Sequence, residues 1–510
     1  MRARAGADNV SGDLVTLFSG VSQNVLGIVV AALAMFAVQV LMTRALGPDG
    51  FGVVTVLTQA AFVASFLTRG GMDMAVLRDV AVDAGTERLD RVRVPVARAA
   101  LIAVALSAAA ALAVVALGDT VLVALSLPIE SNRAPLAAAA LALPFLALAN
   151  VWLAATRGLK IMRYTLYVFW AGQNLGWIVL TVLLWAFSTS ATSSVLAYSL
   201  SWLGAAAAAG YFWRRESRGW VATPPRPGWF SALMRYAGPR APAALFAQLL
   251  FWTDLFVVTR FVGQTEIGIY AAALRAGQVV VVFLASVNLM FGPFVADLHN
   301  RGRTRHLDRL YKTVTRWLVA ATLPAFLLIA VAPEAVLAIF GPDFTAGRAA
   351  LLILIAGQLA NVVTGSAGFI LIMVGRTGYD LAIYTVSILL DLGLALWLCP
   401  RYGIEGAAIA SAVTFTASNA ARLLLVRVFV GIQPYDRHYL RLLAPAASGA
   451  IAMWVAHALT GGGLLDVVVT GALGTLAYGA SFLAVGATPE ERAGVRALLS
   501  RFRAGGPPRS

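Results

Sequence analysis

The ten residues TRALGPDGFG, Thr43–Gly52, return in altered form as TRFVGQTEIG, Thr259–Gly268. One threonine, one arginine and two glycines recur at the same spacing, and each matched pair is separated by 216 residues. Both copies follow a long apolar segment, so their register and their place in the chain agree. The match predicts a parallel internal repeat, in which two halves of the chain share one order of helices, as in many transporters.

The glycines and arginine of Thr43–Gly52 raise the alternative of a phosphate-binding loop. Such a loop needs Gly-x-x-x-x-Gly-Lys-Ser/Thr after a strand of a soluble domain, and neither copy has the lysine or the strand. We therefore interpret both copies as turns between helices, with Arg44 and Arg260 at the level of the lipid headgroups.

The composition is that of a polytopic membrane protein. The 510 residues are 60% hydrophobic and 12% charged, with a mean hydropathy of +0.81, whereas soluble domains are about 25% charged. The net charge of +15 does not indicate nucleic-acid binding, because the arginines are scattered between apolar blocks. The single cysteine, Cys399, excludes an intrachain disulfide. The four histidines are isolated, so we expect no metal site, and no motif predicts a cofactor.

A membrane-spanning helix needs about 20 mainly apolar residues, and fourteen segments meet this criterion. They lie near 17–42, 51–68, 97–117, 135–156, 164–187, 192–213, 239–259, 267–294, 317–340, 349–374, 379–398, 404–426, 441–459 and 464–486. The first is too long for the apolar core of a signal peptide and is expected to remain as helix one. The predicted fold class is therefore all-α, with about fourteen transmembrane helices.

The distribution of basic residues predicts the orientation, because cytoplasmic loops retain Lys and Arg. With the N-terminus inside, the only basic residues in outside loops are Arg44, Arg133, Arg260, Arg348 and Arg401. Both termini are therefore expected in the cytoplasm, in the cell inner membrane. Two inside stretches, 69–98 and 297–316, are predicted to be basic loops.

The predicted domain organisation follows the repeat and a Pro-rich connection. TPPRPGW, Thr223–Trp229, has the composition of a stiff linker after helix six. We expect an N-terminal lobe of helices 1–6 at 1–222, a C-terminal lobe of helices 7–12 at 223–430, and appended helices 13 and 14 at 431–487. Residues 488–510 are predicted to be a cytoplasmic amphipathic tail, since Thr488 and Glu491 have capping-box spacing and one helix face carries Val495, Leu498, Leu499 and Phe502. The alternative is a solvated tail.

Ionisable residues inside spans cost about 2.5–3.5 kcal/mol each and are functional candidates. They are Asp254 in helix seven, Arg275 in helix eight, Asp391 in helix eleven and Arg422 in helix twelve. Asp254 and Arg275 lie at similar depth, so we expect them to form an ion pair. One possibility is that this ion pair only holds two helices together. The other is that a substrate anion, or a proton on Asp254, separates the pair during transport. Arg422, near the inner end of its helix, is expected to extend toward the membrane surface.

Amide side chains are concentrated in helices 1, 5, 7, 8 and 10 and suit a cavity that accepts sugar hydroxyls. The amides predicted to line the substrate and ion pathway, together with Asp254, Arg275 and Asp391, are Gln23, Asn24, Gln39, Asn174, Gln248, Gln278, Gln358 and Asn361. The alternative is that many of them are interhelical hydrogen bonds, worth about 0.6 kcal/mol each. We predict no catalytic residue.

Several stretches together resemble a known family. Arg44–Gly52, Gly70–Met72 and AVLRDVA, Ala75–Ala81, resemble the start of bacterial polysaccharide flippases of the multidrug/oligosaccharidyl-lipid/polysaccharide exporter superfamily. Trp252–Arg275 resembles the family's helix-seven aspartate followed by Gly-x-Tyr-x-x-Ala-x-Arg/Lys, and two later turns, FGPDFTAGRAALLIL and YGIEGAAIASA, agree as well. The resemblance covers nearly the whole chain, and its motifs are specific for the superfamily but weak for the substrate.

The resemblance implies two lobes around a central cavity that opens alternately to each side. It implies inversion of undecaprenyl-pyrophosphate-linked oligosaccharides for capsule, exopolysaccharide or O-antigen, with membrane lipids and a polysaccharide polymerase and chain-length machinery as partners. Helix one carries amides and no arginine, unlike lipid II flippases, which leaves Arg275 as the best cationic candidate for the pyrophosphate. Coupling to protons or sodium is a hypothesis that rests on Asp254 and Asp391.

Three other classes of function compete with this hypothesis. A multidrug exporter of the same superfamily would usually have twelve helices and an acidic, aromatic cavity. A membrane-embedded polymerase or ligase would need a large external loop, but the longest one, 118–134, offers only Asp119, Glu130 and Arg133. A scaffold for polysaccharide assembly would tolerate changes at Asp254 and Arg275. We therefore expect a transporter and not an enzyme.

Overall fold

The computed structural model describes residues 10–85, 88–224, 227–249, 251–281 and 301–487, with the single positions 284, 287, 291, 294, 295, 298 and 299 between them. Throughout these residues the regular structure is helical and contains no strand, so the predicted all-α class is confirmed. Ten helices in them are long and apolar enough to cross a membrane. The predicted number of fourteen is not established, because part of the predicted helix eight lies outside the described residues. The predicted tail at 488–510 also lies outside them.

The elements of the first half of the chain precede the Pro-rich connection. They are α1 (Val10–Thr68), α2 (Met72–Gly85), η1 (Leu89–Arg91), α3 (Arg93–Ala116), α4 (Gly118–Ala124), α5 (Ile129–Gly158), α6 (Arg163–Thr165), η2 (Leu166–Gly172), α7 (Gln173–Trp185) and α8 (Ala191–Glu216).

The elements of the second half continue to the end of the described chain. They are α9 (Trp229–Leu249), α10 (Thr253–Val258), α11 (Gln264–Val279), α13 (Thr304–Val331), α14 (Pro333–Ala338), η3 (Pro342–Gly347), α15 (Arg348–Thr364), α16 (Ala367–Met373), α17 (Thr377–Val430), η4 (Arg437–Leu442), α18 (Leu443–Thr460), α19 (Leu464–Ser481) and η5 (Phe482–Gly486).

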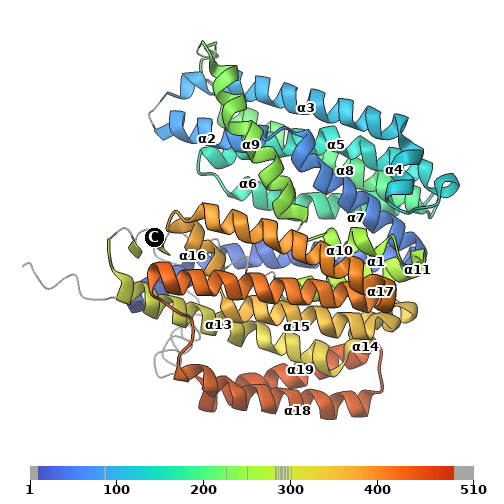
Figure 1. The fold of residues 1–510 in the computed structure, drawn as a ribbon, viewed down its shortest axis with the longest axis vertical. Helices are drawn as coiled ribbons and strands as arrows, with labels where there is room; N and C mark the ends of the chain where they lie inside the picture. The colour runs from blue at the N-terminus through green and yellow to red at the C-terminus, as the bar shows by residue number, and fades with distance from the viewer. Residues whose placement is uncertain are drawn as a thin grey trace, which may run out of the picture.

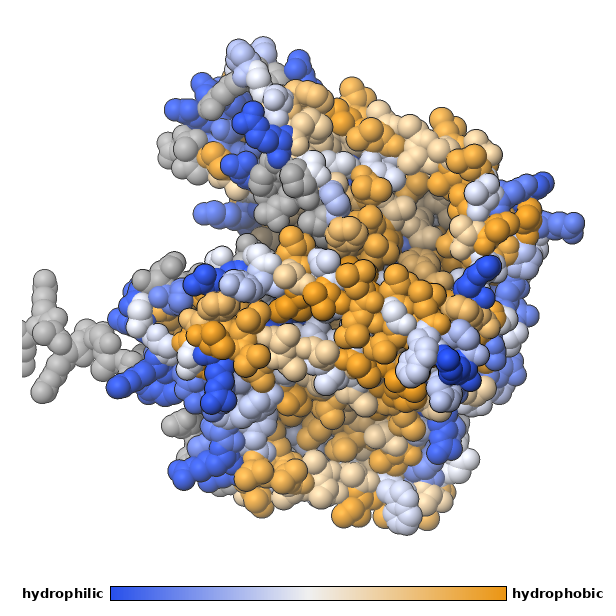
Figure 2. All heavy atoms as spheres, in the orientation of Figure 1, coloured by the Kyte–Doolittle hydropathy of each residue, from blue (hydrophilic) through white to orange (hydrophobic). Residues whose placement is uncertain are grey.

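The helices form two bundles, which lie one above the other in Figure 1. The upper bundle holds α2 to α8, and the lower bundle holds α11 and α13 to α19. Figure 2 shows an apolar band across the middle of both bundles and hydrophilic side chains at the left and right ends. Large apolar side chains are exposed among the described residues, such as Leu101, Leu112 and Trp454. This pattern is that of helices whose outer surface faces lipid, with the membrane normal running left to right.

Two long helices each contain a reversal at a glycine. Gly47 in α1 has φ 66° and ψ −176°, and Gly403 in α17 has φ 54° and ψ −130°. These conformations are accessible to glycine because it has no Cβ. Each helix therefore consists of two legs, and the legs correspond to predicted helices 1 and 2 and predicted helices 11 and 12.

The first helix of each repeat packs against the opposite bundle. Phe36, in the first leg of α1, lies 5.3 Å from Phe340 beside α14, measured between ring centroids. Conversely, Leu233 and Ala237 of α9 are buried in one cluster with Met72 of α2 and other upper-bundle residues. The two bundles are thus joined by a reciprocal crossing, while the predicted lobe boundaries at 222 and 430 remain predictions.

Several predicted boundaries are wrong. The stretches 69–98 and 297–316 are not simple loops, because α2 and the first turns of α13 occupy much of them. The predicted span 349–374 is broken at Gly365 (φ 62°), where a Cβ would overlap the side chain of Thr315. Local hydropathy does not register such breaks, since the residues on both sides of a break are equally apolar.

Candidate functional site

Asp254, in the first turn of α10, is a buried carboxylate with defined hydrogen-bond donors. Its Oδ2 accepts a bond of 2.7 Å from the hydroxyl of Tyr270 on α11, and its Oδ1 accepts one of 2.7 Å from the amide of Leu255. The residue is 3% exposed. Ser411 on α17 lies close to this carboxylate. Because one hydrogen-bond donor belongs to α10 and the other to α11, the position of Asp254 depends on how these two helices pack together.

Asp391 on α17 lies near Asp254 and is equally buried. The charges of the two carboxylates act on one another, and both act on Tyr270. Two neighbouring buried carboxylates repel each other unless a proton or a cation is shared between them. The structure thus brings together the two acidic residues that the sequence singled out. Among the described residues no group of three or more His, Cys, Asp or Glu side chains suits a metal ion.

The predicted ion pair between Asp254 and Arg275 is wrong. Arg275 instead lies over the indole of Trp252, with the guanidinium carbon 4.8 Å from the ring centroid, and its Nη1 donates to Oε1 of Gln278 at 3.3 Å. Similar depth along two helices does not determine the direction of the side chains. Arg275 is half-buried, and its guanidinium is close enough to Tyr198 of α8 for the two groups to interact electrostatically. It therefore lies where the upper and lower bundles face each other.

Arg422 also differs from its expected position. Its Nε lies 3.3 Å from Oδ1 of Asp380, and both side chains are 10% exposed. The guanidinium carbon is 4.8 Å from the ring centroid of Tyr384. Arg422 thus does not extend to the membrane surface, because a carboxylate on the other leg of α17 neutralises it inside the fold.

Three of the predicted amides, Asn174, Gln358 and Asn361, make hydrogen bonds within their own helices. Asn174 donates to the carbonyl of Trp170 one turn earlier, at 2.8 Å, and Asn361 donates to Gln358 at 3.3 Å. Gln39 is buried, and Gln248 is half-buried. The side chains of Gln23 and Asn24 lie outside the described part of α1. Asn174 therefore supports its own helix, whereas Gln278 is the amide that contacts a charged candidate.

Sequence reasoning missed an aromatic series in the upper bundle. Phe169 lies in the π-helical turn η2, and its ring centroid is 5.3 Å from that of Trp202. Tyr198 lies 6.2 Å from Trp202 and 4.9 Å from Trp177. The series thus leads to Tyr198, the residue on which Arg275 acts. A π-helical turn inside a span often marks a functional region, but hydropathy does not distinguish it from α-helix.

Sequence reasoning also missed that the two repeat turns meet. Thr265 donates a hydrogen bond of 2.5 Å to Oδ1 of Asp49. A Cβ on Gly52 would lie 2.9 Å from the carbonyl oxygen of Gln264, and one on Gly268 would overlap the carbonyl of Pro48. The backbones therefore approach as closely as glycine permits.

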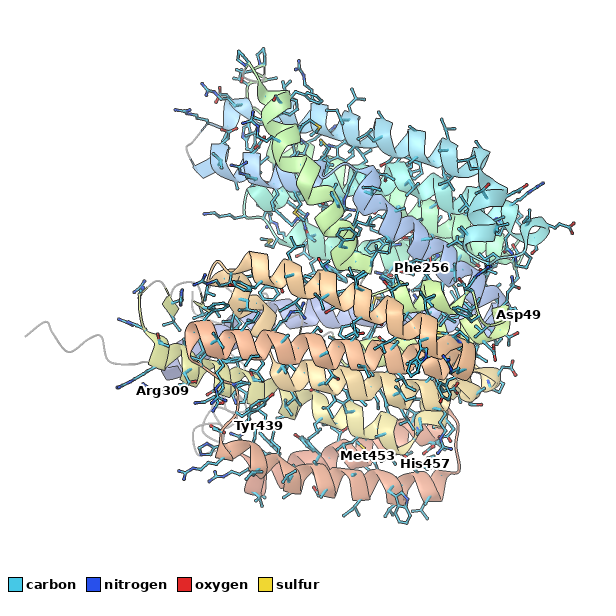
Figure 3. All side chains as sticks on the ribbon, in the orientation of Figure 1. Asp49, Phe256, Arg309, Tyr439, Met453 and His457 are labelled. Carbon is cyan, nitrogen blue, oxygen red and sulfur yellow. The ribbon has the colours of Figure 1, made fainter. Side chains whose placement is uncertain are left out.

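Arg44 adds a second link at the same end of the molecule. Its Nε donates to the carbonyl of Ile339 at 2.9 Å, and its Nη2 donates to that of Ala338 at 2.5 Å. Figure 3 shows Asp49 at the right end and Arg309 at the left end. Figure 2 shows the surface hollowed between the two bundles at the left. The bundles therefore contact each other at the Asp49 end, and on the face shown in Figure 2 a hollow lies between them at the opposite end.

Comparisons with known proteins agree with this architecture. A family model described as polysaccharide biosynthesis protein matches residues 17–297, and a second model, MatE, matches residues 239–397. A probable low-salt glycan biosynthesis flippase of Haloferax volcanii, Agl15, is 23% identical over 203 residues. That match covers 40% of this chain and 43% of the Haloferax volcanii protein, so it spans less than half of that relative.

Two solved structures share the fold. An inward-facing multidrug resistance transporter of the MATE family matches with a TM-score of 0.67 and 13% identity, over 78% of this chain and 94% of the other. The lipid II flippase MurJ, in an inward closed conformation, matches with a TM-score of 0.67 and 12% identity, over 91% of this chain and 98% of the other. At these identities the matches establish the fold alone.

Proposed function

Because the chain belongs to the polysaccharide biosynthesis protein family of the multidrug/oligosaccharidyl-lipid/polysaccharide exporter superfamily, we propose that it moves undecaprenyl-pyrophosphate-linked oligosaccharides across the cell inner membrane. The glycan would be a unit of capsule, exopolysaccharide or O-antigen. The observation that carries the proposal is the asymmetry of the two bundles, which are joined through Asp49 and Thr265 at one end and are hollowed between them at the other. A carrier that opens alternately to each side needs two such ends.

The charge and aromatic side chains near the bundle interface suit a phosphorylated glycan. Arg275 offers a guanidinium whose planar set of donors matches phosphate oxygens. Its contacts with Trp252 and Gln278 hold it away from the acidic pair, so its charge is available to an anion. The rings near Tyr198 supply flat apolar surfaces of the kind that pack against sugar rings.

The carboxylates of Asp254 and Asp391 are the proposed coupling site. A pair of buried acids binds a proton or a sodium ion more readily than a large organic substrate. Because Asp254 is hydrogen-bonded to α11 and Arg275 also lies on α11, a change of charge at the acids can alter the position of the cationic residue. A D254N/D391N variant with unchanged transport would remove this coupling hypothesis.

The decisive experiment is reconstitution of the full chain in proteoliposomes with lipid-linked oligosaccharides from the host pathway. We expect protein-dependent movement of the labelled glycan between leaflets, and a loss of about tenfold or more in R275Q if a charge-assisted phosphate contact is removed. Failure with every lipid-linked glycan of the host would overturn the proposal. Loss of glycan export in R275Q with intact polysaccharide assembly complexes would separate transport from a scaffold role.

A multidrug exporter is the second candidate function, favoured by the MatE match over 239–397 and by the buried acidic pair. It predicts accumulation of a cationic dye in the same proteoliposomes, driven by a proton or sodium gradient and abolished in D254N/D391N.

The further proposals are that both termini lie in the cytoplasm and that polymerase and chain-length proteins are partners. The accessibility of single cysteines at either end, in a background lacking Cys399, would test the orientation.

A further inference from the structure

A cavity lined mainly by basic side chains includes none of the residues described around Asp254 and Arg275. It has a volume of about 510 Å³ and lies between the start of α13 and the end of α17. Arg309, which lines it, is at the left end in Figure 3, opposite to Asp49. Four cations line the cavity, Arg305, Arg309, Lys312 and Arg427, against the single carboxylate of Asp308. Such an excess of positive charge favours an anionic occupant.

Local structure explains why these side chains converge. Arg305, Asp308 and Lys312 follow one another at helical spacing on α13, so they share one face of the helix. On the other side, α17 ends at Val430, and the following Gly431, with φ 77°, turns the chain back toward α13. The amide of Gln433 then donates to Oδ1 of Asp308 at 3.4 Å. The carboxylate therefore holds the loop against α13.

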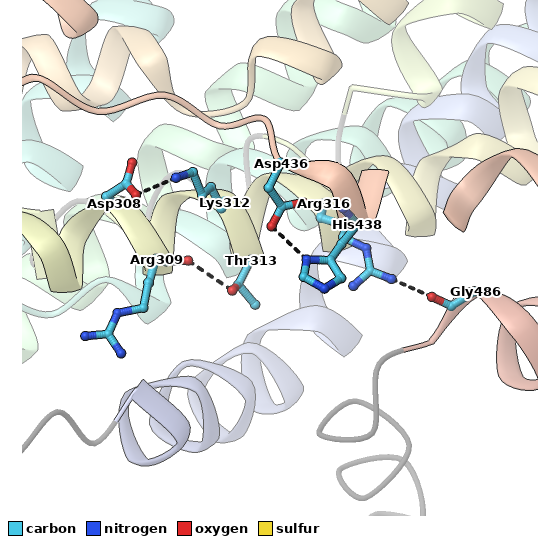
Figure 4. Close-up of polar contacts among 8 residues, drawn as sticks. All are labelled: Asp308, Arg309, Lys312, Thr313, Arg316, Asp436, His438 and Gly486. Atoms are coloured by element: carbon cyan, nitrogen blue, oxygen red, sulfur yellow. Dashed lines mark hydrogen bonds and ion pairs between the residues drawn. The ribbon is translucent and has the colours of Figure 1, made fainter. Parts of the chain in front are cut away.

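The same carboxylate accepts a bond of 2.5 Å from Lys312, drawn in Figure 4. Its negative charge is thus already paired with one of the four cations. Arg305 on α13 and Arg427 on α17 place positive charge on the two walls of the cavity. An anion between these walls would bridge α13 and α17.

The exposed face of α17 indicates what kind of anion reaches this cavity. Leu424, Arg427 and Val428 lie at i, i+3 and i+4, and Leu424 and Val428 are 61% and 66% exposed. An apolar surface that faces lipid therefore runs directly into a wall of the cavity at Arg427. A soluble anion would make no favourable contact with the apolar side chains. A phospholipid can contact them with its acyl chains and can contact the arginines with its phosphate.

We propose that this cavity is a binding site for the headgroup phosphate of an anionic glycerophospholipid in the adjacent leaflet. The phosphodiester lies between Arg305 and Arg427, and an acyl chain lies along Leu424 and Val428. The bound lipid links the start of α13 to the end of α17. This site does not depend on which substrate the protein transports.

The test uses the full-length protein, delipidated in detergent, with phosphatidylglycerol added back and bound lipid counted by native mass spectrometry. We expect R305Q/R427Q to bind phosphatidylglycerol at least about tenfold more weakly than the unmodified protein. The matched control is R88Q/R98Q, which removes two exposed basic residues predicted on the same side of the membrane. This control should change the affinity less than about twofold.

The unmodified protein supplies a second arm that needs no variant. Phosphatidylglycerol should bind at least about tenfold more tightly than phosphatidylcholine, and glycerol phosphate without acyl chains should not displace it. Equal weakening in the control variant would overturn the proposal in favour of diffuse surface charge. Displacement by glycerol phosphate would overturn the lipid assignment in favour of a soluble phosphate, and equal binding of phosphatidylcholine would exclude selection by charge.

Discussion

Asp49 and Thr265 are joined by a hydrogen bond of 2.5 Å, and they are equivalent residues of the two repeats. The surrounding contacts are reciprocal in the same way. Gly52 meets the carbonyl of Gln264, and Gly268 meets the carbonyl of Pro48. Each contact is the other one moved by the repeat offset of 216 residues. The two turns therefore form a self-complementary contact within one chain, like the interface of a two-fold dimer.

The contact predicts that G268A weakens closure at this end. A Cβ at Gly268 has no room beside Pro48, so we expect a cost of about 1–3 kcal/mol to the closed arrangement. A cysteine pair at Asp49 and Thr265, in a background lacking Cys399, should oxidise readily, and G268A should reduce the yield.

The control for this experiment is G263A in the same turn. A Cβ on Gly263 meets nothing within 4 Å, and the residue has φ −73°, so alanine fits there. Cross-linking should remain as in the parent pair. Equal cross-linking in G268A and G263A would contradict a gate formed by the two glycines.

The cross-link itself should stop transport. If this end must open during the cycle, oxidation of the D49C/T265C pair traps the bundles in contact and abolishes glycan movement, and a reducing agent restores it. Single cysteine variants treated with the same oxidant serve as controls. Transport that persists in fully oxidised protein would show that the Asp49 end need not open.

The hydroxyl of Tyr270 is predicted to matter beyond its packing. Y270F removes the donor to Oδ2 of buried Asp254 and should cost about 1–3 kcal/mol of stability. Thermal unfolding in detergent measures this loss. It should also change the dependence of transport on the proton or sodium gradient.

Y311F is the matched variant. The hydroxyl of Tyr311 donates to the carbonyl of Thr364 at 2.7 Å and is buried too, so its loss should lower stability by a comparable amount. Its gradient dependence should stay unchanged. The same response in both variants would assign Tyr270 a structural role only.

Arg316 is predicted to anchor the appended helices α18 and α19. Its Nη2 donates to the carbonyl of Gly486 at 2.6 Å, as Figure 4 shows, and so ties α13 to the end of η5. Hydrogen bonds to charged groups are worth about 1.5–3 kcal/mol. R316Q should therefore make the connection at 431–442 more sensitive to limited proteolysis.

The comparison variant is T313V on the same helix. The hydroxyl of Thr313 bonds the carbonyl of Arg309 within α13, so it joins no other element. Its proteolysis should match that of the unmodified protein. If R316Q is cleaved no faster than T313V, the anchor lies elsewhere.

At the other end of the same helix pair, Asp466 is predicted to be a structural acid. It is fully buried and accepts bonds from Thr460 at 2.5 Å, Thr470 at 2.7 Å and His457 at 2.6 Å. D466A leaves these donors without their acceptor and should cost about 1–3 kcal/mol. H457A should cost less, since the histidine side chain is 32% exposed. Thermal unfolding of the two variants tests the order, and a larger loss in H457A would contradict it.

Much of the fold was predictable because the deciding signals are local. Apolar segments of membrane length predict spans wherever they occur, and the reversals at Gly47 and Gly403 lie between predicted spans. The membrane class and the flippase family follow from such segments and from turn motifs. The acidic pair was also identifiable, because an ionised group inside a span is unusual whatever its partner.

The partners of the polar residues were not predictable. Tyr270 lies within the motif that carried the family resemblance, yet its bond to Asp254 depends on how α10 and α11 face each other. Arg275 was expected to contact Asp254 from depth alone and instead lies over Trp252. The depth of a residue in the membrane follows from its position along one helix. The group that its side chain contacts depends on how two helices pack together.

The membrane class, the repeat and the identity of the two turns follow from hydropathy and glycine spacing, which are local features of the sequence. The meeting of these turns, and the crossing of the first helix of each repeat to the opposite bundle, become visible in the folded chain alone. The physical reason is that contact between the two halves depends on close backbone packing at Gly52 and Gly268. Two residues 216 positions apart acquire a common environment only when the bundles have assembled.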